Sequence, residues 1–221
     1  MCRPSDPHGP GCHYIIANTA GHLWRFAGLD PTVTWEKKTK RPWNASLKTL
    51  CWKIGESFVK VSGKEDDVYG HLYLDRKAKE VANNLGGLLA DQATAKLAKF
   101  KIDKNTEAYA WYAGLLTASK AKQIMSAPAE KRQGLALKLR AAKMEGDGLP
   151  MLPPAHIHAR AKRWAVKLFL AHYHTVAFVD RFKEMPPKPY VITHLGHAHE
   201  ILVPNWPAEF KDFKQGLVAV E

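Results

Sequence analysis

The chain has 221 residues, of which 46% are hydrophobic, so it can bury a core and has room for one large or two small domains. Its 33 lysines and arginines exceed its 21 aspartates and glutamates, which gives a formal net charge of +12. Such an excess indicates a polyanionic partner or an acidic membrane surface, although a generally basic soluble protein is the plainer alternative. Between residues 120 and 183, 13 basic residues face only 4 acidic ones, which favours a binding face.

Three cysteines, at positions 2, 12 and 51, are too few and too widely spaced for a disulfide framework. This pattern favours a reducing cytoplasm. No apolar run approaches the roughly 18–20 residues of a membrane span, and the N-terminus has no secretory hydrophobic segment. We therefore expect a cytoplasmic protein that does not contact a membrane.

The first element expected is a flexible arm over residues 1–13, because three prolines and two glycines there oppose a regular helix. The arm also contains four residues of the types that bind zinc, and these are Cys2, His8, Cys12 and His13. Their spacing matches no familiar zinc finger. Zinc binding in the arm is therefore an alternative to a plain arm, and no cofactor is expected.

Residues 14–62 are expected to form two helices joined by a cationic loop. A short helix is predicted over Tyr14 to Ala27, ended by Gly28 with Pro31 just beyond. Apolar residues recur at three- and four-residue spacing from Asn44 to Val61, which predicts a second helix. Between the helices lies the basic run Lys37-Lys38-Thr39-Lys40-Arg41.

Four tryptophans lie near this basic run and are assigned two different roles. Trp24 and Trp52 fall within the two predicted helices and are expected to fill the core between them. Trp35 and Trp43 flank the basic run, where an exposed indole can stack on a nucleic-acid base. We expect the second pair to contact the ligand.

Residues 63–146 are predicted to be a further helical region. A helical pattern that Asp66-Asp67 can cap runs from about Val68 toward Phe100. Gly86-Gly87 predicts a break near its middle, and so a hairpin. Two more helices are predicted, roughly over Thr106 to Met125 and over Pro128 to Met144.

Residues 147–221 are predicted to be a basic helix followed by a tail rich in proline and histidine. Pro153-Pro154 fits a helix start, and the helix is expected from about Ala155 to Phe182. The tail should be extended, with a short strand at Tyr190 to Ile192 at most. The sequence as a whole predicts a mainly α fold, a multi-helix bundle with irregular proline-rich N- and C-terminal segments.

The stretch from Ala20 to about Val61 resembles the C-terminal domain of the bridge-RNA-guided insertion-sequence transposases. That family's pattern runs from an apolar helix through Gly-Leu-x-Pro and a basic loop to a helix rich in Leu, Arg and Lys. Here the pattern appears as Phe26 to Pro31, Lys37 to Arg41 and Asn44 to Leu50. The remainder resembles an extension carried by a transposase-like subgroup. The resemblance implies DNA strand exchange by an N-terminal carboxylate-bearing nuclease-like domain, together with a serine nucleophile from the C-terminal domain.

The chain departs from the family pattern in its catalytic parts. It contains no counterpart of the N-terminal catalytic domain, and no serine occurs between Pro31 and Ser46, where the family places a Ser-Gly pair. No catalytic residue is therefore transferred from the family. We expect a protein that binds DNA, or structured RNA, through phosphate contacts and lacks strand-transfer activity alone. The expected contact residues are Lys37, Lys38, Lys40, Arg41, Lys48, Arg160, Lys162, Arg163 and Lys167.

Two other functions are weighed against nucleic-acid binding. The eleven histidines include three His-x-His pairs, at positions 156/158, 172/174 and 197/199. Imidazole binds zinc and related metals well, but helical residues two apart point about 200° apart, so the first two pairs cannot chelate. His194, His197 and His199, with Glu200, are the candidate ligands of a metal-dependent hydrolase or nuclease. The third hypothesis is a helical structural or interaction protein of mobile-element or phage origin. DNA against RNA and the oligomeric state stay open.

Overall fold

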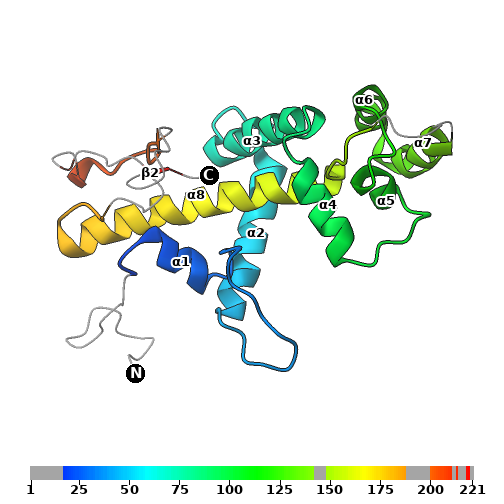
Figure 1. Cartoon of the computed structure of the whole chain (residues 1–221). Coiled ribbons are helices and arrows are strands. Elements are labelled where there is room, and N and C mark those ends of the chain that lie inside the picture. The colour runs from blue at the N-terminus through cyan, green and yellow to red at the C-terminus, as the bar shows by residue number, and fades with distance from the viewer. Residues whose placement is uncertain (1–16, 142–147, 188–199, 211–212, 214–217, 220–221) are drawn as a thin grey trace. The chain divides into compact units, whose positions relative to one another are not determined.

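A computed structural model describes residues 17–141, 148–187, 200–210, 213 and 218–219 of the chain (Figure 1). Within these residues the structure has eight α-helices, one 3-10 helix and one pair of two-residue strands, which confirms the predicted mainly α fold. Two compact units divide the chain: the middle unit, Ser57–Ala165, and the terminal unit, Met1–Glu56 with Val166–Glu221. In the described part of the chain, no helix has the length and apolar character to cross a membrane.

Helix α1 (Ala20–Phe26) opens the terminal unit. Thr19 caps the first turn, because its side chain accepts a hydrogen bond from His22 N. Residues 17–19 therefore precede the helix, and the prediction that it starts at Tyr14 is wrong for them. Residues 14–16 lie outside the described residues. The end of the helix is as predicted, because Gly28 adopts a φ of 68° and Leu29 N donates to Trp24 O over 2.9 Å. A hydrogen bond from the residue after a left-handed glycine back to the last turn is a common helix C-cap.

Trp24 fixes α1 onto helix α8 (Pro154–Phe182). Its indole Nε1 donates to Lys167 O at 2.9 Å, and only 9% of the residue is exposed. Lys167 Nζ lies 4.2 Å from the centroid of the Trp24 ring. The predicted core role of Trp24 is thus confirmed, and the contact is held by packing, a hydrogen bond and a cation over the ring.

Helix α2 (Ala45–Val61) matches its predicted range. Asn44 Oδ1 accepts a hydrogen bond from Leu47 N at 2.9 Å, which caps the first turn. Cys51 is buried, and burial raises the pKa of its thiol. Trp52 is 60% exposed, so the prediction that it fills the core is wrong. One residue beyond Cys51 lies about 100° further round the helix, away from the buried side.

The C-terminal part of α8 and the tail complete the terminal unit. Buried residues from Val166 onward include Leu168, Ala171 and Val179. Beyond the helix, strand β1 (Glu200–Ile201) pairs antiparallel with β2 (Val218–Ala219), and a 3-10 helix, η1, covers Ala208–Phe210. The strand predicted at Tyr190 to Ile192 lies outside the described residues. The predicted helix over Ala155 to Phe182 is confirmed, with its start at Pro154.

The middle unit contains the break that the paired glycines predicted, but the two helices on either side of it do not pack along each other, so the predicted hairpin is wrong. Helix α3 (Val68–Leu85) and helix α4 (Ala90–Lys99) are separated at Gly86-Gly87, and Gly87 has a φ of 83°. Asp67 occupies the N-cap position of α3 as predicted, but its side chain makes no capping hydrogen bond. The position of the break follows from glycine, which adopts positive φ at little cost.

Three short helices follow: α5 (Glu107–Tyr112), α6 (Ala118–Ser126) and α7 (Ala129–Ala141). A single helix over Thr106 to Met125 is therefore wrong. Gly114, with a φ of 66°, ends the first piece, and Thr117 caps the second by accepting from Lys120 N. These helices enclose a hydrophobic cluster of Ala110, Trp111, Leu116, Ala121, Ile124, Ala136 and Met151.

Candidate nucleic-acid interface

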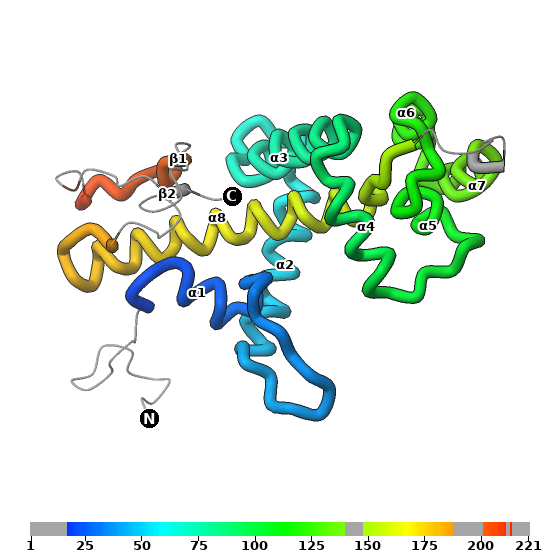
Figure 2. Tube along the Cα trace, in the orientation of Figure 1, coloured from blue at the N-terminus to red at the C-terminus, as the bar shows by residue number. Residues whose placement is uncertain are grey.

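Residues 27–44, here called the cationic loop, connect α1 to α2 and are closed at their base. Asn44 N donates to Phe26 O at 2.9 Å, so the two ends of the loop meet. Figure 2 shows the chain running out from the end of α1 and turning back to the beginning of α2. At the turn, Thr39 N donates to Glu36 O at 3.3 Å, and Lys38 has a φ of 74°. The loop therefore has a defined shape.

The two tryptophans of this loop each contact a cation, Arg41 from the loop and Lys48 from α2. The rings of Trp35 and Trp43 meet edge to face, with centroids 6.1 Å apart and planes at 65°. Lys48 Nζ lies 4.0 Å from the centroid of Trp43, and Arg41 Cζ lies 5.6 Å from that of Trp35. Trp35 Nε1 also donates to Thr39 O at 3.0 Å. Each ring thus carries a cation, an attractive arrangement that holds charge beside an aromatic surface.

Gly28 allows Trp43 to pack against the end of α1. A Cβ atom at residue 28 would lie 2.8 Å from Cγ of Trp43 and 3.1 Å from Cδ of Lys48. A side chain at residue 28 would overlap the indole, so glycine is needed there both for the positive φ of the turn and for the packing of Trp43. The packing of Trp43 at Gly28 thus joins the Gly-Leu-Asp-Pro turn to the far end of the loop that carries the basic run.

The charge of the cationic loop is strongly positive on its exposed side. Lys37, Lys38, Lys40 and Arg41 are all exposed, and in the described part of the chain the three lysines form no salt bridge. The loop holds two carboxylates, Asp30 and Glu36. A hydrogen bond from the Thr32 hydroxyl lowers the pKa of Asp30, with help from the nearby charges of Arg25 and Lys167. Asp30 is therefore ionised at neutral pH and is held by its hydrogen bond from Thr32.

The other expected contact residues are divided between the two units. Lys167 belongs with the cationic loop to the terminal unit, where it covers Trp24. Arg160, Lys162 and Arg163 belong to the middle unit. The cations at 37–48 and those at 160–163 therefore belong to different units.

Arg160 is held by a buried ion pair. Its Nε donates to Glu80 Oε2 at 2.9 Å and its Nη1 donates to Gln92 Oε1 at 2.6 Å, while Arg76 Nη2 donates to Glu80 Oε1 at 2.7 Å. Glu80 is only 3% exposed. Burial works to raise the pKa of Glu80, but the hydrogen bonds from Arg160 and Arg76 outweigh it and hold that pKa below its ordinary value. A phosphate group would compete with a carboxylate for Arg160.

Each of the four histidines of α8 has a separate partner. His156 Nδ1 lies 3.0 Å from the hydroxyl of Tyr112, and His158 Nδ1 lies 2.8 Å from that of Tyr73. His172 Nε2 donates to Ile201 O at 2.9 Å, and His174 Nε2 donates to Ala17 O at 2.6 Å. Burial lowers the pKa of His156, His172 and His174. The histidine pairs diverge as their spacing predicted.

Candidate metal ligands were also expected elsewhere in the chain. His194, His197 and His199 lie outside the described residues, as do Cys2, His8, Cys12 and His13, and the side chain of Glu200 is not described either. Among the residues that are described, no three His, Cys, Asp or Glu side chains are grouped to hold a metal ion.

Comparison of the chain with family models, with curated proteins and with solved structures gives no match. The resemblance to the transposase C-terminal domain therefore depends on the motifs from Phe26 to Leu50 alone.

Proposed function

We propose that the chain binds nucleic acid, DNA or structured RNA, through the cationic loop. The observation that supports this most directly is the closed loop itself, which presents exposed Lys37, Lys38, Lys40 and Arg41 around a packed pair of tryptophans. Lysine and arginine neutralise phosphates and release condensed counterions, and exposed indole rings stack on bases of any sequence. The same loop combines both contact types, which suits a nucleic acid better than a purely acidic protein surface.

The proposal assigns binding, and no chemistry, to this loop. No serine, cysteine or histidine occurs between Pro31 and Ser46. The hydroxyl of Thr32 donates to Asp30, and that of Thr39 donates to Glu36 O, so both serve the loop's own shape. The order of helix, Gly-Leu-Asp-Pro turn, basic loop and helix is that of the transposase C-terminal domain, and we propose a transposase-like binding element without strand transfer of its own.

Salt dependence of binding tests the phosphate contacts. Replacing Lys37 and Lys40 by glutamine should weaken binding of a duplex and lower the slope of log affinity against log salt by about 2, one per lysine lost. The matched control replaces Lys99 and Lys101 of the middle unit, which removes the same charge elsewhere. If the two double variants lose affinity and slope equally, net charge and not the cationic loop accounts for binding.

Trp35 gives a second test, because it is 39% exposed and lies beside the cations. Trp35→Ala should weaken binding to single strands by about 1–3 kcal/mol, the usual value of one stacked base, and weaken duplex binding less. Trp35→Phe keeps an aromatic ring but removes the Nε1 hydrogen bond to Thr39 O. It should retain most of the single-strand affinity. A loss that is equal for both variants would mean that Trp35 only shapes the loop.

A further inference from the structure

Helix α3 of the middle unit buries polar side chains on one face. Tyr73 shares a 2.8 Å hydrogen bond with His158, and Glu80 accepts from Arg160 at 2.9 Å. Asn84 Nδ2 donates to Leu152 O at 2.9 Å, while its Oδ1 accepts from Leu152 N at 2.8 Å. All three α3 residues are at most 3% exposed. This face of α3 is therefore fixed against α8 and the segment before it by satisfied polar groups.

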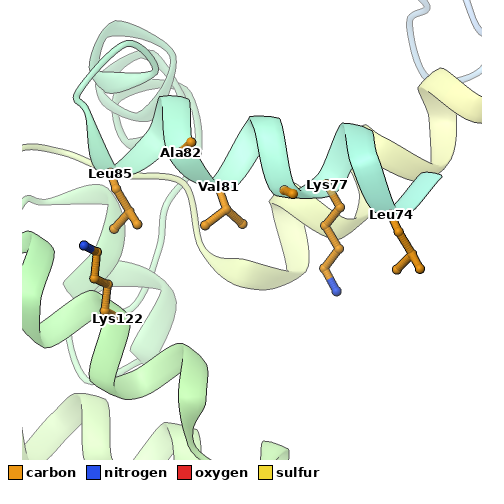
Figure 3. Close-up of a pocket in the computed structure, with 7 residues that line it drawn as sticks. Leu74, Lys77, Val81, Ala82, Leu85 and Lys122 are labelled. Carbon is orange, nitrogen blue, oxygen red and sulfur yellow. The ribbon is translucent and has the colours of Figure 1, made fainter. Parts of the chain in front are cut away.

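A second face of α3, about 100° round the helix, is apolar and open. It forms a groove of about 630 Å³ lined by Leu74, Lys77, Ala78, Val81, Ala82, Leu85 and, from α6, Lys122. Figure 3 shows the side chains of Leu74, Val81 and Leu85 in a row along α3, with that of Lys122 reaching up from α6 toward Leu85. Leu74 is 42% exposed, whereas Val81 and Leu85 are partly buried and form the floor.

The core uses only part of this apolar face. A helix that packs on a core usually turns its apolar residues inward and its polar residues outward. On α3, Val81 and Leu85 pack against the two core clusters. Leu74, Ala78 and Ala82, at four-residue spacing, remain exposed. An apolar stripe left open along a groove is typical of a surface that another protein covers.

The groove continues into a second hollow of about 460 Å³. The two share Lys77 and Val81, and the second is lined further by Met125, Arg132, Ile157 and His158 among others. No aspartate or glutamate lines either hollow. Lys77 and Lys122 form no salt bridge with any described carboxylate, and the Arg132 guanidinium donates to Met125 O and Ala127 O, which leave its charge uncompensated. The potential along the groove is thus positive.

We propose that this groove binds an amphipathic helix of an acidic partner protein. Leu74 and Leu85 are 11 residues apart, and at 1.5 Å per residue they span about 17 Å, or three helical turns. A partner helix of that length would place apolar residues spaced by three and four on Val81 and Leu85, and carboxylates beside Lys77 and Lys122. A second copy of the chain fits poorly, because each copy carries a net charge of +12.

A synthetic peptide tests this proposal on the full chain. The probe is a dye-labelled helical peptide of about 15 residues, with leucines along one stripe and glutamates flanking them. Fluorescence anisotropy should detect its binding, whereas a scrambled peptide and one with lysines in place of the glutamates should bind at least about tenfold more weakly. Saturable binding of the first peptide alone supports the proposal, and no binding, or equal binding of all three, overturns it.

Matched variants locate the peptide on the chain. Leu74→Ser should weaken peptide binding about tenfold through lost apolar contact, and Lys77→Glu with Lys122→Glu should weaken it about as much. The controls are Leu88→Ser and Lys79→Glu, at exposed residues near the groove that do not line it. Groove variants that bind the peptide as tightly as the wild type would overturn the proposal even if the peptide binds.

Because an acidic peptide could also be attracted to the cationic loop, the Lys37→Gln, Lys40→Gln variant is measured as well. Unchanged peptide binding by this variant supports the groove, and lost binding assigns the peptide to the loop and overturns the proposal. Two further occupants have their own readouts. If the chain self-associates and Leu74→Ser abolishes this, the occupant of the groove is a second copy. If the chain binds anionic lipid vesicles and Leu74→Ser abolishes this, the occupant is a membrane. Either result overturns the proposal of an acidic partner protein.

Discussion

Replacement of Gly28 by alanine tests whether the turn after α1 and the tryptophan of the cationic loop form one structure. A non-glycine residue in the left-handed region costs about 1–2 kcal/mol. The added Cβ would also meet Trp43 Cγ at 2.8 Å and Lys48 Cδ at 3.1 Å. Forcing an indole aside in a packed site costs about 1–3 kcal/mol more. The total of about 2–5 kcal/mol should lower Tm by about 4–20 °C in a chain of this length.

Thermal unfolding followed by circular dichroism measures this loss, and a double-mutant cycle separates its two causes. In a Trp43→Ala background the overlap with the indole is gone, and the flexible Lys48 side chain can move aside. There Gly28→Ala should cost only about 1–2 kcal/mol, from its backbone conformation. Gly21→Ala in α1 is the control, because its Cβ would come no closer than 3.6 Å to Thr19 Oγ1. A Gly28→Ala cost that is the same with and without Trp43 would refute the reasoning.

Three further changes should have measurable effects. Asn84→Ala removes both hydrogen bonds to the buried Leu152 backbone and should cost about 2–4 kcal/mol in chemical unfolding, whereas the neighbouring Asn83→Ala should change stability by less than about 0.5 kcal/mol. Arg160→Ala leaves buried Glu80 with Arg76 alone and should lower the free energy of unfolding by about 3 kcal/mol. The pKa of Glu80 is lowered in the folded protein, so the stabilisation from its ion pairs is present above the ordinary value of 4.5 and is lost as the pH falls through the folded value. The Tm of the variant should therefore decrease less in acid than that of the wild type. Burial lowers the pKa of His172 from 6.5, so its contribution to stability is present above pH 6.5 and is lost as the pH falls through the folded value. His172→Gln retains a donor for Ile201 O and should make Tm less dependent on pH below about 6.5.

Local chemistry explains which parts of the fold could be predicted. Gly28 and the pair Gly86-Gly87 end helices because glycine alone adopts positive φ cheaply, and this property is visible in the sequence. Gly114 does the same between α5 and α6, but a single glycine inside a helical pattern is often tolerated, so that break was missed. Trp24 and Trp52 lie on equally apolar stretches, and only the packing of other segments decides that the first is buried and the second exposed.

The candidate site was predictable in composition and unpredictable in geometry. The basic run and its flanking tryptophans are evident in the sequence, but the contact of Trp43 with Gly28 requires the loop to close over residues fifteen apart. Arg160 was grouped with nearby cations because the sequence shows its neighbours, whereas its ion pair joins it to Glu80, eighty residues earlier. The apolar groove on α3 was missed for a related reason, because a pattern shows that a stripe exists but not which stripe the fold leaves open.

The hydrogen bond between Asn44 N and Phe26 O bears on the thermodynamics of the proposed nucleic-acid binding. A loop fastened at both ends loses its chain entropy when the protein folds, so little further ordering is needed when a ligand arrives. Binding to such a preorganised loop should therefore show a small heat-capacity change, unlike the large one of a segment that folds on its target. Asn44→Pro removes this hydrogen bond and should turn the loop into a segment that folds on its target, with a larger heat-capacity change on binding.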